Sequence, residues 1–131
     1  MLLVKTYLAK SKIHGNGVFA GEVIPKGAKM WQFVDGYDHI YTQAEFKRLP
    51  KQAREFIAAF GYAVEGFVFL TVDNDRLINH SPKANTRFGD DGITYAARTI
   101  KKGEEITNDY REFDPVFSAA FLKKKLPKRK G

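Results

Sequence analysis

Residues 76–81 of this chain read RLINHS, and residues 103–110, about two dozen positions further on, read GEEITNDY. In the first stretch, the polar triplet Asn79-His80-Ser81 follows directly on apolar residues. A buried amide or imidazole without a hydrogen-bond partner costs about 1–3 kcal/mol, so these groups need partners. A turn capped by the side chains of Asn79 and Ser81 would provide them, and so would a ligand site.

Two further features flank this polar triplet. Tyr110 ends the second stretch, and a tyrosine in such a place is, taken alone, most often a core residue with a solvated hydroxyl. Upstream, residues 14–20 read HGNGVFA, where Gly15 and Gly17 alone would be typical of a tight turn. They are not a dinucleotide-binding fingerprint, because the third glycine, Gly21, comes too late and no βαβ pattern follows.

The three motifs together resemble those of the SET-domain protein lysine methyltransferases, in the family's order, from about Lys12 to Phe113. The resemblance implies a mainly β fold of the β-clip (SET) type. Such a fold has several small sheets, a short helical insert and a C-terminal segment threaded through a loop like a pseudoknot. We expect a single SET domain over residues 1–122, with the insert at about residues 36–66.

The resemblance also implies a cofactor, S-adenosylmethionine, which leaves as S-adenosylhomocysteine. The backbone at Gly15 and Gly17 is expected to press against this cofactor, where a β-carbon would collide. His14 and Asn16 would flank that contact. Tyr62 is a further candidate, near either the cofactor carboxylate or the substrate channel.

At the second motif, the resemblance assigns separate roles to neighbouring residues. The Asn79 side chain is expected to bond the methionyl end of the cofactor, and the His80 backbone to bond the adenine edge. Asn85 is expected to brace the loop. Lys83 and Ala84 replace a cysteine and a proline that are usual in the family, and the lost cysteine would serve zinc.

Tyr110 is the expected catalytic residue. In the family its hydroxyl lies beside the transferring methyl, where it accepts weak C–H···O contacts and orients the lysine amine. A lysine with a pKa of about 10.4 is mostly protonated at pH 7, but a narrow aromatic channel and the nearby sulfonium both lower its pKa. The resemblance therefore implies no dedicated general base.

Three residues are candidates for the substrate channel. Asn108 stands where Phe or Tyr is common and influences the number of methyl groups added. Its smaller side chain leaves either an open space, which permits further methylation, or a water site, which halts it. We favour multiple methylation, with the Asn108 side chain turned outward. Phe113 and Phe117 either close the channel or simply dock on the body.

Composition favours one domain without a metal site. The 131 residues are 44% hydrophobic, enough for one core, and eleven Phe and six Tyr favour a β-rich interior. The chain has no cysteine, and its three histidines show no metal-ligand spacing. No apolar run reaches the roughly 18 residues of a membrane span, and Lys5 interrupts the apolar start. We expect a soluble protein that is not exported.

The net charge of +7 is concentrated in a tail. Six of the 22 basic residues lie at Lys123–Lys130, which leaves 16 basic residues against 15 acidic ones elsewhere. We expect residues 123–131 to form a disordered basic tail that could attract nucleic acid or an acidic protein. The short, cysteine-free layout resembles stand-alone bacterial SET proteins, so we expect a cytoplasmic protein, nuclear only if delivered into a eukaryotic host.

The spacing of apolar residues predicts short strands at residues 2–8, 28–34, 67–72, 93–97 and 105–107. The segment AGEVIPKGA at 20–28 is echoed by AARTIKKGE at 96–104. Two copies are too few for a repeat array, so they suggest paired turns within one sheet architecture.

Residues 42–60 form the one predicted helical region. Thr42 and Glu45 make a capping box, Pro50 should split the region into two helices, and Gly61 should end the second in a left-handed conformation. The spacing of apolar residues predicts one buried face, formed by Phe46, Leu49, Ala53, Phe56, Ile57 and Phe60.

We therefore predict an S-adenosylmethionine-dependent protein lysine N-methyltransferase, whose partner is a protein with a target lysine. One alternative is a non-catalytic SET-fold module that binds nucleic acid or acidic protein through its tail, although Tyr110 and Asn79-His80 argue against it. The other is a methyltransferase that acts on a small amine.

Overall fold

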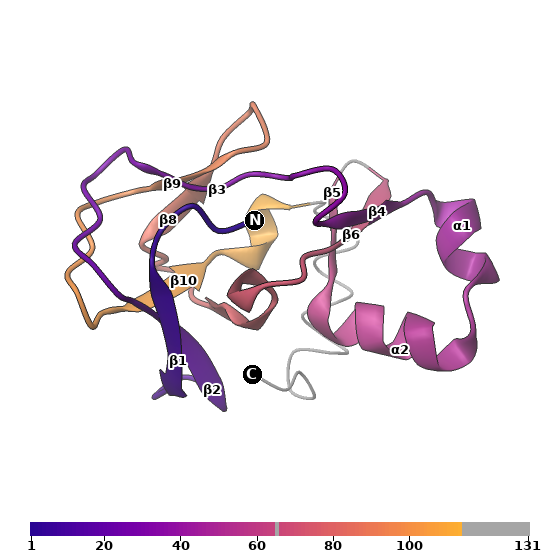
Figure 1. The fold of residues 1–131 in the computed structure, drawn as a ribbon, viewed down its shortest axis with the longest axis horizontal. Helices are drawn as coiled ribbons and strands as arrows, with labels where there is room; N and C mark the ends of the chain where they lie inside the picture. The colour runs from indigo at the N-terminus through magenta and orange to yellow at the C-terminus, as the bar shows by residue number, and fades with distance from the viewer. Residues whose placement is uncertain (65, 114–131) are drawn as a thin grey trace.

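Short strands dominate the computed structural model, which describes residues 1–64 and 66–113 (Figure 1). The predicted fold class, mainly β with several small sheets and few helices, is confirmed. The strands are β1 (Thr6–Lys10), β2 (Asn16–Ala20), β3 (Lys29–Trp31), β4 (His39–Tyr41), β5 (Tyr62–Val64), β6 (Phe67–Leu70), β7 (Asn79–His80), β8 (Thr86–Phe88), β9 (Thr94–Ala96) and β10 (Glu105–Asn108). The helices are α1 (Gln43–Arg48), α2 (Lys51–Phe60) and the 3-10 turns η1 (Asn74–Leu77) and η2 (Tyr110–Glu112).

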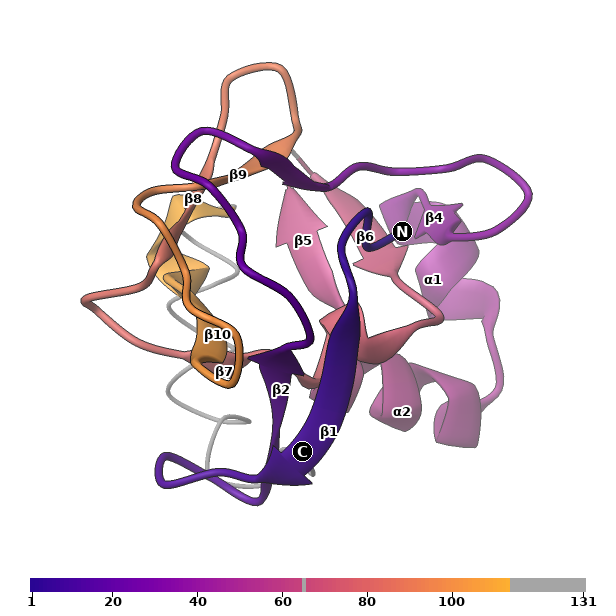
Figure 2. The ribbon, with the colours of Figure 1, turned by 60° about the vertical axis from the view of Figure 1, so that its left-hand side comes forward.

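The described strands form three small sheets. Their strand orders are β1-β2-β10-β7, β3-β9-β8 and β4-β6-β5. The two helices lie at one end of the molecule, beside the sheet β4-β6-β5, whereas the turn between β8 and β9 projects from the top in both views (Figures 1 and 2). Residues 16–20, expected to begin as a turn, instead form the strand β2, which pairs with β1.

The repeated segments 20–28 and 96–104 meet as the predicted pair of turns. Ile24 and Ile100 exchange both backbone hydrogen bonds, at 2.9 and 2.8 Å, and are 1% and 0% exposed. The two lysine-glycine turns then close on the opposite copy in the same way: Gly27 N–H donates to the Ala96 carbonyl and Gly103 N–H donates to the Ala20 carbonyl, each at 2.8 Å. The two copies are therefore related by a local two-fold axis.

The hydrophobic core is centred on these paired turns. Its buried members come from the segments on either side of the helical insert: Val18, Ala20, Ile24, Met30, Ile78, Ala96, Ile100 and Ile106. Ile78 and Ile106 belong to the two sequence stretches that carry the polar motifs. The core therefore fixes the backbone from which the polar motif residues extend.

Strand β10 is held at both edges by the loop that follows β7. Ser81 N–H donates to the Asn108 carbonyl at 3.0 Å. The Asn85 side chain donates to the Glu105 carbonyl at 2.8 Å and accepts from Thr107 N–H at 3.0 Å. Successive peptide groups of a strand point to opposite edges, so these bonds lie on opposite sides of β10. The strand thus passes through the loop, as the expected pseudoknot requires.

The helical region is capped and divided as predicted. Thr42 and Glu45 form the complete capping box, and Pro50 separates α1 from α2. The prediction for Gly61 is wrong, because its φ of −88° is not left-handed. A β-carbon at Gly61 would instead lie 2.5 Å from the Phe69 carbonyl oxygen. Close packing of the chain against β6, and not backbone conformation, therefore requires the glycine.

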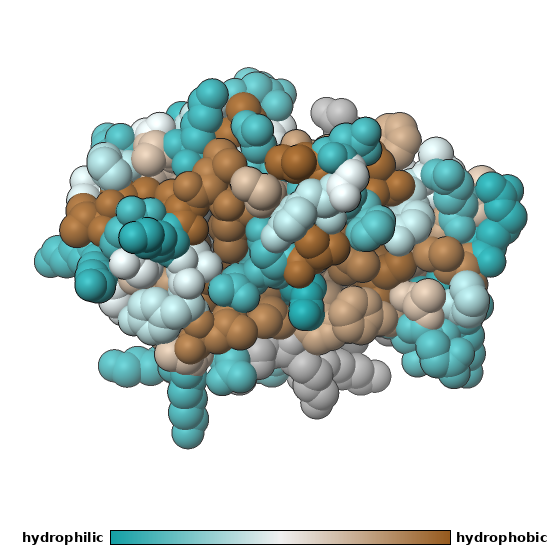
Figure 3. Space-filling view, viewed as in Figure 1, coloured by the Kyte–Doolittle hydropathy of each residue, from teal (hydrophilic) through white to brown (hydrophobic). Residues whose placement is uncertain are grey.

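The predicted burial of one helical face is largely wrong. Of the six apolar residues on that face, only Ile57 is buried, at 3% exposure, whereas Phe56 is 45% exposed. Phe56 and Phe60 instead pack on each other and face the Arg76 guanidinium, 5.7 and 5.3 Å from their ring centroids. Figure 3 shows that apolar surface accordingly lies in several patches between polar residues.

A buried carboxyl links η1 to the strand that follows α2. Asp75 is only 4% exposed, and the Tyr62 hydroxyl donates to it at 3.0 Å. Burial raises the pKa of Asp75 to about 6, because the charged carboxylate loses its hydration, although the bond from Tyr62 opposes the shift. Ionisation of Asp75 near neutral pH therefore destabilises the folded protein.

Asn85 should contribute strongly to stability. In Asn85→Ala, one buried and one partly buried peptide group of β10 lose their partners, and we expect the free energy of unfolding to fall by about 2–4 kcal/mol. Asn74→Ala is a matched control, since within residues 1–64 and 66–113 the Asn74 side chain donates only to the Thr6 hydroxyl, at 3.1 Å, outside the strand ladder. Urea unfolding measures both variants. Equal losses in the two would contradict the special role of Asn85.

Asp75 should make stability depend on pH. The pKa of Asp75 in the folded state lies above the unfolded value of 3.8. The stability that protonated Asp75 contributes is therefore fully present below pH 3.8 and is lost as pH rises through about 6. The free energy of unfolding of Asp75→Asn, measured relative to wild type, should therefore rise by about 2–3 kcal/mol from pH 4 to pH 8. Asp91→Asn should change in the opposite direction, chiefly below about pH 4, because hydrogen bonds lower the pKa of Asp91. Unfolding curves at several pH values test both signs.

Candidate active site

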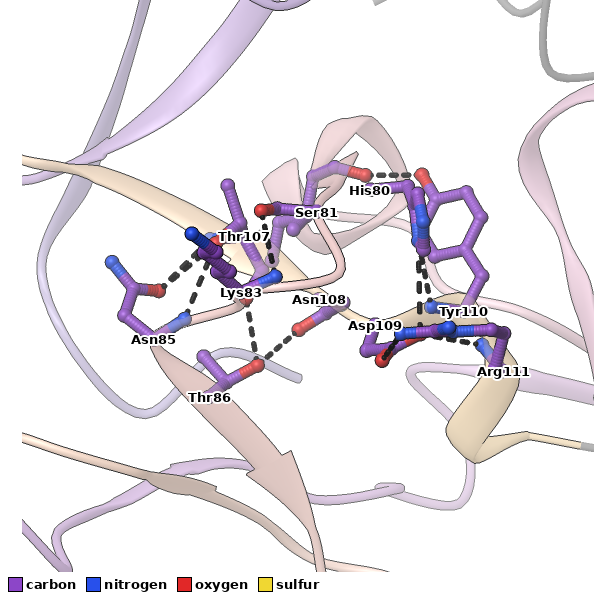
Figure 4. Close-up of polar contacts among 11 residues, drawn as sticks. His80, Ser81, Lys83, Asn85, Thr86, Thr107, Asn108, Asp109, Tyr110 and Arg111 are labelled. Atoms are coloured by element: carbon purple, nitrogen blue, oxygen red, sulfur yellow. Dashed lines mark hydrogen bonds and ion pairs between the residues drawn. The ribbon is translucent and has the colours of Figure 1, made fainter.

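Tyr110 is fixed at the point where β10 runs into η2 (Figure 4). Its ring is only 4% exposed, and its hydroxyl donates a short hydrogen bond to the Ile78 carbonyl. Its backbone N–H donates to Nδ1 of His80 at 3.1 Å. The Asp109 side chain caps η2 by accepting from Arg111 N–H at 3.0 Å. The backbone and the hydroxyl of Tyr110 are therefore both fixed by the segment 78–80.

The bond from Tyr110 sets the tautomer of the neutral His80 ring. Because Nδ1 accepts a hydrogen bond, the neutral ring carries its proton on Nε2. Burial lowers the pKa of His80, and the positive charge of Arg111 adds to this, whereas Asp109 opposes it. Asp109 lies 3.9 Å from Nδ1, too far for a hydrogen bond, and instead pairs with Arg111 at 2.7 Å. His80 thus serves as an uncharged brace for Tyr110.

Asn79 connects the motif to the loop that precedes β2. Its amide nitrogen lies within hydrogen-bond distance of the Ser11 hydroxyl (3.1 Å), the His14 carbonyl (2.9 Å) and the Glu105 carboxylate (3.0 Å). The Ser11 hydroxyl also donates to Glu105, at 2.8 Å. Sequence reasoning missed Ser11 and Glu105, although Glu105 lies within the quoted motif GEEITNDY.

The two glycines of the first motif meet different demands. Gly15 has a φ of +47°, a left-handed conformation that favours glycine. A β-carbon at Gly17 would lie 2.3 Å from a carboxylate oxygen of Glu105. The close approach at Gly17 is therefore to Glu105. Half-buried His14 and exposed Asn16 lie beside the two glycines, and their contact with a cofactor stays a prediction.

The residues around Asn79 fit the expected cofactor. S-adenosylmethionine carries an ammonium group, which needs an acceptor. Among the described residues, every hydrogen bond of the Asn79 side chain runs from its nitrogen, so its oxygen Oδ1 remains to accept. The positive φ of Gly15 turns the adjoining backbone without a side chain in the way. Asn79 and the loop 14–17 are therefore the residues that would hold this group.

An aromatic cavity of about 930 Å³ is lined by Phe113, the C-cap residue of η2, which begins at Tyr110. Phe113, only 7% exposed, forms its inner wall with Tyr62, on which it stacks with ring centroids 4.6 Å apart. The Phe113 ring lies 5.3 Å from that of Phe88 and 6.3 Å from that of Tyr110. The structure thus places Tyr62 and Phe113 in the cavity wall. Phe117 lies outside the described residues.

Asn108 is turned inward, contrary to expectation. It is 7% exposed, and its side-chain oxygen accepts from the Thr86 hydroxyl at 2.7 Å (Figure 4). The Thr86 hydroxyl also lies 2.8 Å from the Thr107 carbonyl. The sequence placed Asn108 on a strand edge, but the loop that encloses β10 covers that edge and buries the side chain.

Three further expectations concern the basic tail, a membrane span and a metal site. The basic residues Lys123–Lys130 lie outside the described residues. Across residues 1–64 and 66–113, no helix is long and apolar enough to cross a membrane. Within the same ranges, no group of three His, Asp or Glu side chains could hold a metal ion.

The chain matches a known family and known folds. The model of the SET domain family matches residues 15–111. A Plasmodium falciparum protein assigned as a histone methyltransferase superposes with a TM-score of 0.58 at 23% identity, covering 83% of this chain and 95% of that one. A humanized mutant of the Chaetomium thermophilum Polycomb Repressive Complex 2, bound to the inhibitor GSK126, superposes with a TM-score of 0.60 at 24% identity. That match covers 84% of this chain but only 15% of the Chaetomium chain.

No curated protein matches the chain significantly. The two structural neighbours are too distant in sequence to show more than a shared fold. The family match, however, spans residues 15–111 and so covers nearly all of the three motifs, whose residues meet around Asn79. The chain therefore belongs to the SET domain family, a family of S-adenosylmethionine-dependent methyltransferases.

Proposed function

We propose that this chain transfers a methyl group from S-adenosylmethionine to the ε-amine of a protein lysine. The observation that carries the proposal is the position of Tyr110. Its ring packs near His80, with centroids 5.2 Å apart, and near Phe113 of the aromatic cavity, with centroids 6.3 Å apart. His80 adjoins the residues that fit the cofactor, and Phe113 adjoins the space that fits an alkyl chain.

Asn79 and the loop 14–17 would hold the cofactor. When bound, S-adenosylmethionine supplies a methyl group on a positively charged sulfur, and the lysine nitrogen forms its new bond to carbon as the bond from carbon to sulfur breaks. The protein contributes alignment, because reacting groups held in line react much faster than free ones. Asn79 lies on β7, which pairs with β10, and Tyr110 follows the end of β10 in η2, so the paired strands provide that alignment.

The hydroxyl of Tyr110 is oriented by its own hydrogen bond. Because its hydrogen is donated to the Ile78 carbonyl, the lone pairs of the oxygen point elsewhere. An oxygen in this state can accept weak C–H···O contacts from a methyl group and a hydrogen bond from an amine. Tyr110 would thus position the acceptor amine, and it need not remove a proton.

The aromatic cavity would supply a reactive amine. A lysine side chain among Tyr62, Phe88 and Phe113 loses most of its hydration, which lowers its pKa and increases the neutral fraction. The same walls exclude water, which would otherwise solvate the amine. A protein lysine fits this space because its alkyl stem is apolar and only its tip must reach Tyr110.

Two measurements test the proposal in order. Calorimetry with S-adenosylhomocysteine should show saturable binding to the folded chain. A lack of binding would contradict the proposed cofactor. Labelled S-adenosylmethionine should then transfer label to a lysate of the source organism. Label in the protein fraction supports a protein substrate, whereas label confined to small molecules would support a small-amine methyltransferase.

Tyr110→Phe should lower turnover by about 10-fold or more, since a loss of only about 1.4 kcal/mol of transition-state stabilisation is sufficient. Affinity for S-adenosylhomocysteine should stay within a few-fold, because the residues that fit the cofactor are unchanged. Tyr7→Phe is the control, since Tyr7 is 44% exposed and stacks on Phe19 away from the site. Wild-type turnover in Tyr110→Phe would refute the assignment of Tyr110.

Asn108 should permit more than one methyl transfer. Its side chain is smaller than Phe or Tyr, and its oxygen is occupied by the Thr86 hydroxyl. We therefore expect di- or trimethyl product under excess cofactor, and at least as much from Asn108→Ala, where the space grows. Mass spectrometry of a methylated lysate protein measures the distribution. Monomethyl product alone, from both proteins, would show that Asn108 does not set the outcome.

A further inference from the structure

The charged residues that line the aromatic cavity are all acidic among the described residues. Half of the residues that line it are aromatic, and none of its described lining residues is Lys, Arg or His. Three are acidic: Asp90, Asp91 and Glu112. This is unexpected in a chain with 22 basic and 15 acidic residues. The cavity is therefore a local acidic region in a basic protein.

Asp90 and Asp91 are held on a rigid part of the cavity rim. They lie in the turn between β8 and β9, which Gly89 N–H closes by donating to the Ile93 carbonyl at 2.8 Å. Asp91 stabilises the same turn by accepting from Ile93 N–H at 3.0 Å and from the Tyr95 hydroxyl. Asp91 thus has a structural role, whereas exposed Asp90 makes no hydrogen bond or ion pair with the described residues.

Glu112 approaches the cavity from another element, η2. Its carboxylate accepts from the backbone N–H of Phe88. Partial burial raises the pKa of Glu112, and the charge of Asp109 adds to this, while Arg87 opposes it. A carboxylate that has lost part of its hydration gains more from a nearby cation than a fully solvated one does.

The neighbouring basic side chains only partly offset these charges. Arg87 is held over the ring of Tyr95, 4.6 Å from its centroid, and its charge also reaches Glu112. Lys29 acts on Asp91. Neither basic residue lines the cavity. Asp90 in particular remains available for a cation brought by a ligand.

We propose that the cavity binds a peptide whose target lysine is flanked by basic residues, with Asp90 and Glu112 as the residues that select them. The inference rests on the proposed function in taking a lysine as the group that enters the aromatic walls. The apolar walls suit the alkyl stem, and the acidic rim suits positive charges on either side of it. An acidic peptide or a nucleic acid would bring negative charge to the same carboxylates and be repelled.

Binding of short synthetic peptides tests the charge preference directly. The peptides share one central lysine and differ only in their flanks, which are Arg, Gly-Ser or Glu. With excess S-adenosylhomocysteine and the full chain, fluorescence anisotropy should show that the Arg-flanked peptide binds about 5- to 10-fold more tightly than the Glu-flanked one. Added salt should reduce this ratio, because salt screens exposed charges.

Variants identify the responsible carboxylates. The double substitution Asp90→Asn with Glu112→Gln should bring the ratio close to one, since both amides keep the size of the side chain and Gln can still accept from Phe88 N–H. Glu55→Gln is the control, because Glu55 lies outside the cavity and pairs with Lys51 at 3.9 Å. Equal binding of all flanks to wild type, or a ratio that the double variant leaves unchanged, would overturn the proposal.

The same peptides separate this inference from the proposed function. Flank-dependent binding without methyl transfer would contradict the proposed enzymatic function but support the acidic recognition surface. Methyl transfer with no flank preference would support the function and overturn the acidic selection. Methyl transfer in wild type that favours Arg flanks, and loses this preference in the double variant, would support both.

Discussion

The site depends on one constraint, the enclosure of β10 by the loop 79–86. The backbone of Ser81 bonds one edge of the strand and the side chain of Asn85 bonds the other. A strand held at both edges cannot shift in register without breaking both sets of bonds. Because Tyr110 follows β10 after one residue, its position is set by this enclosure and not by flexible loop residues.

Two chemically different environments lie near Tyr110. The polar cluster of Ser11, Asn79 and Glu105 fixes the loop that precedes β2. Tyr62 and Phe113, in contrast, form apolar walls. Tyr110 contacts both, through the imidazole of His80 and the ring of Phe113. Tyr110 thus lies near both the polar cluster and the apolar walls.

The sequence predicted the features that depend on short-range patterns. The motifs identified the family, the echo of 20–28 in 96–104 predicted the paired turns, and the spacing of Thr42 and Glu45 predicted the capping box. Predictions that depended on packing were less accurate. Gly61 is required by the nearby Phe69 carbonyl, which no local pattern reveals. The inward position of Asn108 likewise depends on Thr86, a residue 22 positions earlier that only the threaded fold brings near.

The threading of β10 also has a consequence for how the protein folds. The enclosing residues and the enclosed strand lie some twenty or more positions apart, and loop closure over such separations slows folding. During synthesis the segment 79–86 emerges first and has no strand to enclose until β10 follows. A nascent chain that lacks β10 therefore also lacks Tyr110, and it exposes the apolar surface that Ile106 would cover. Assembly of the candidate active site and completion of the core are, for this chain, a single late event.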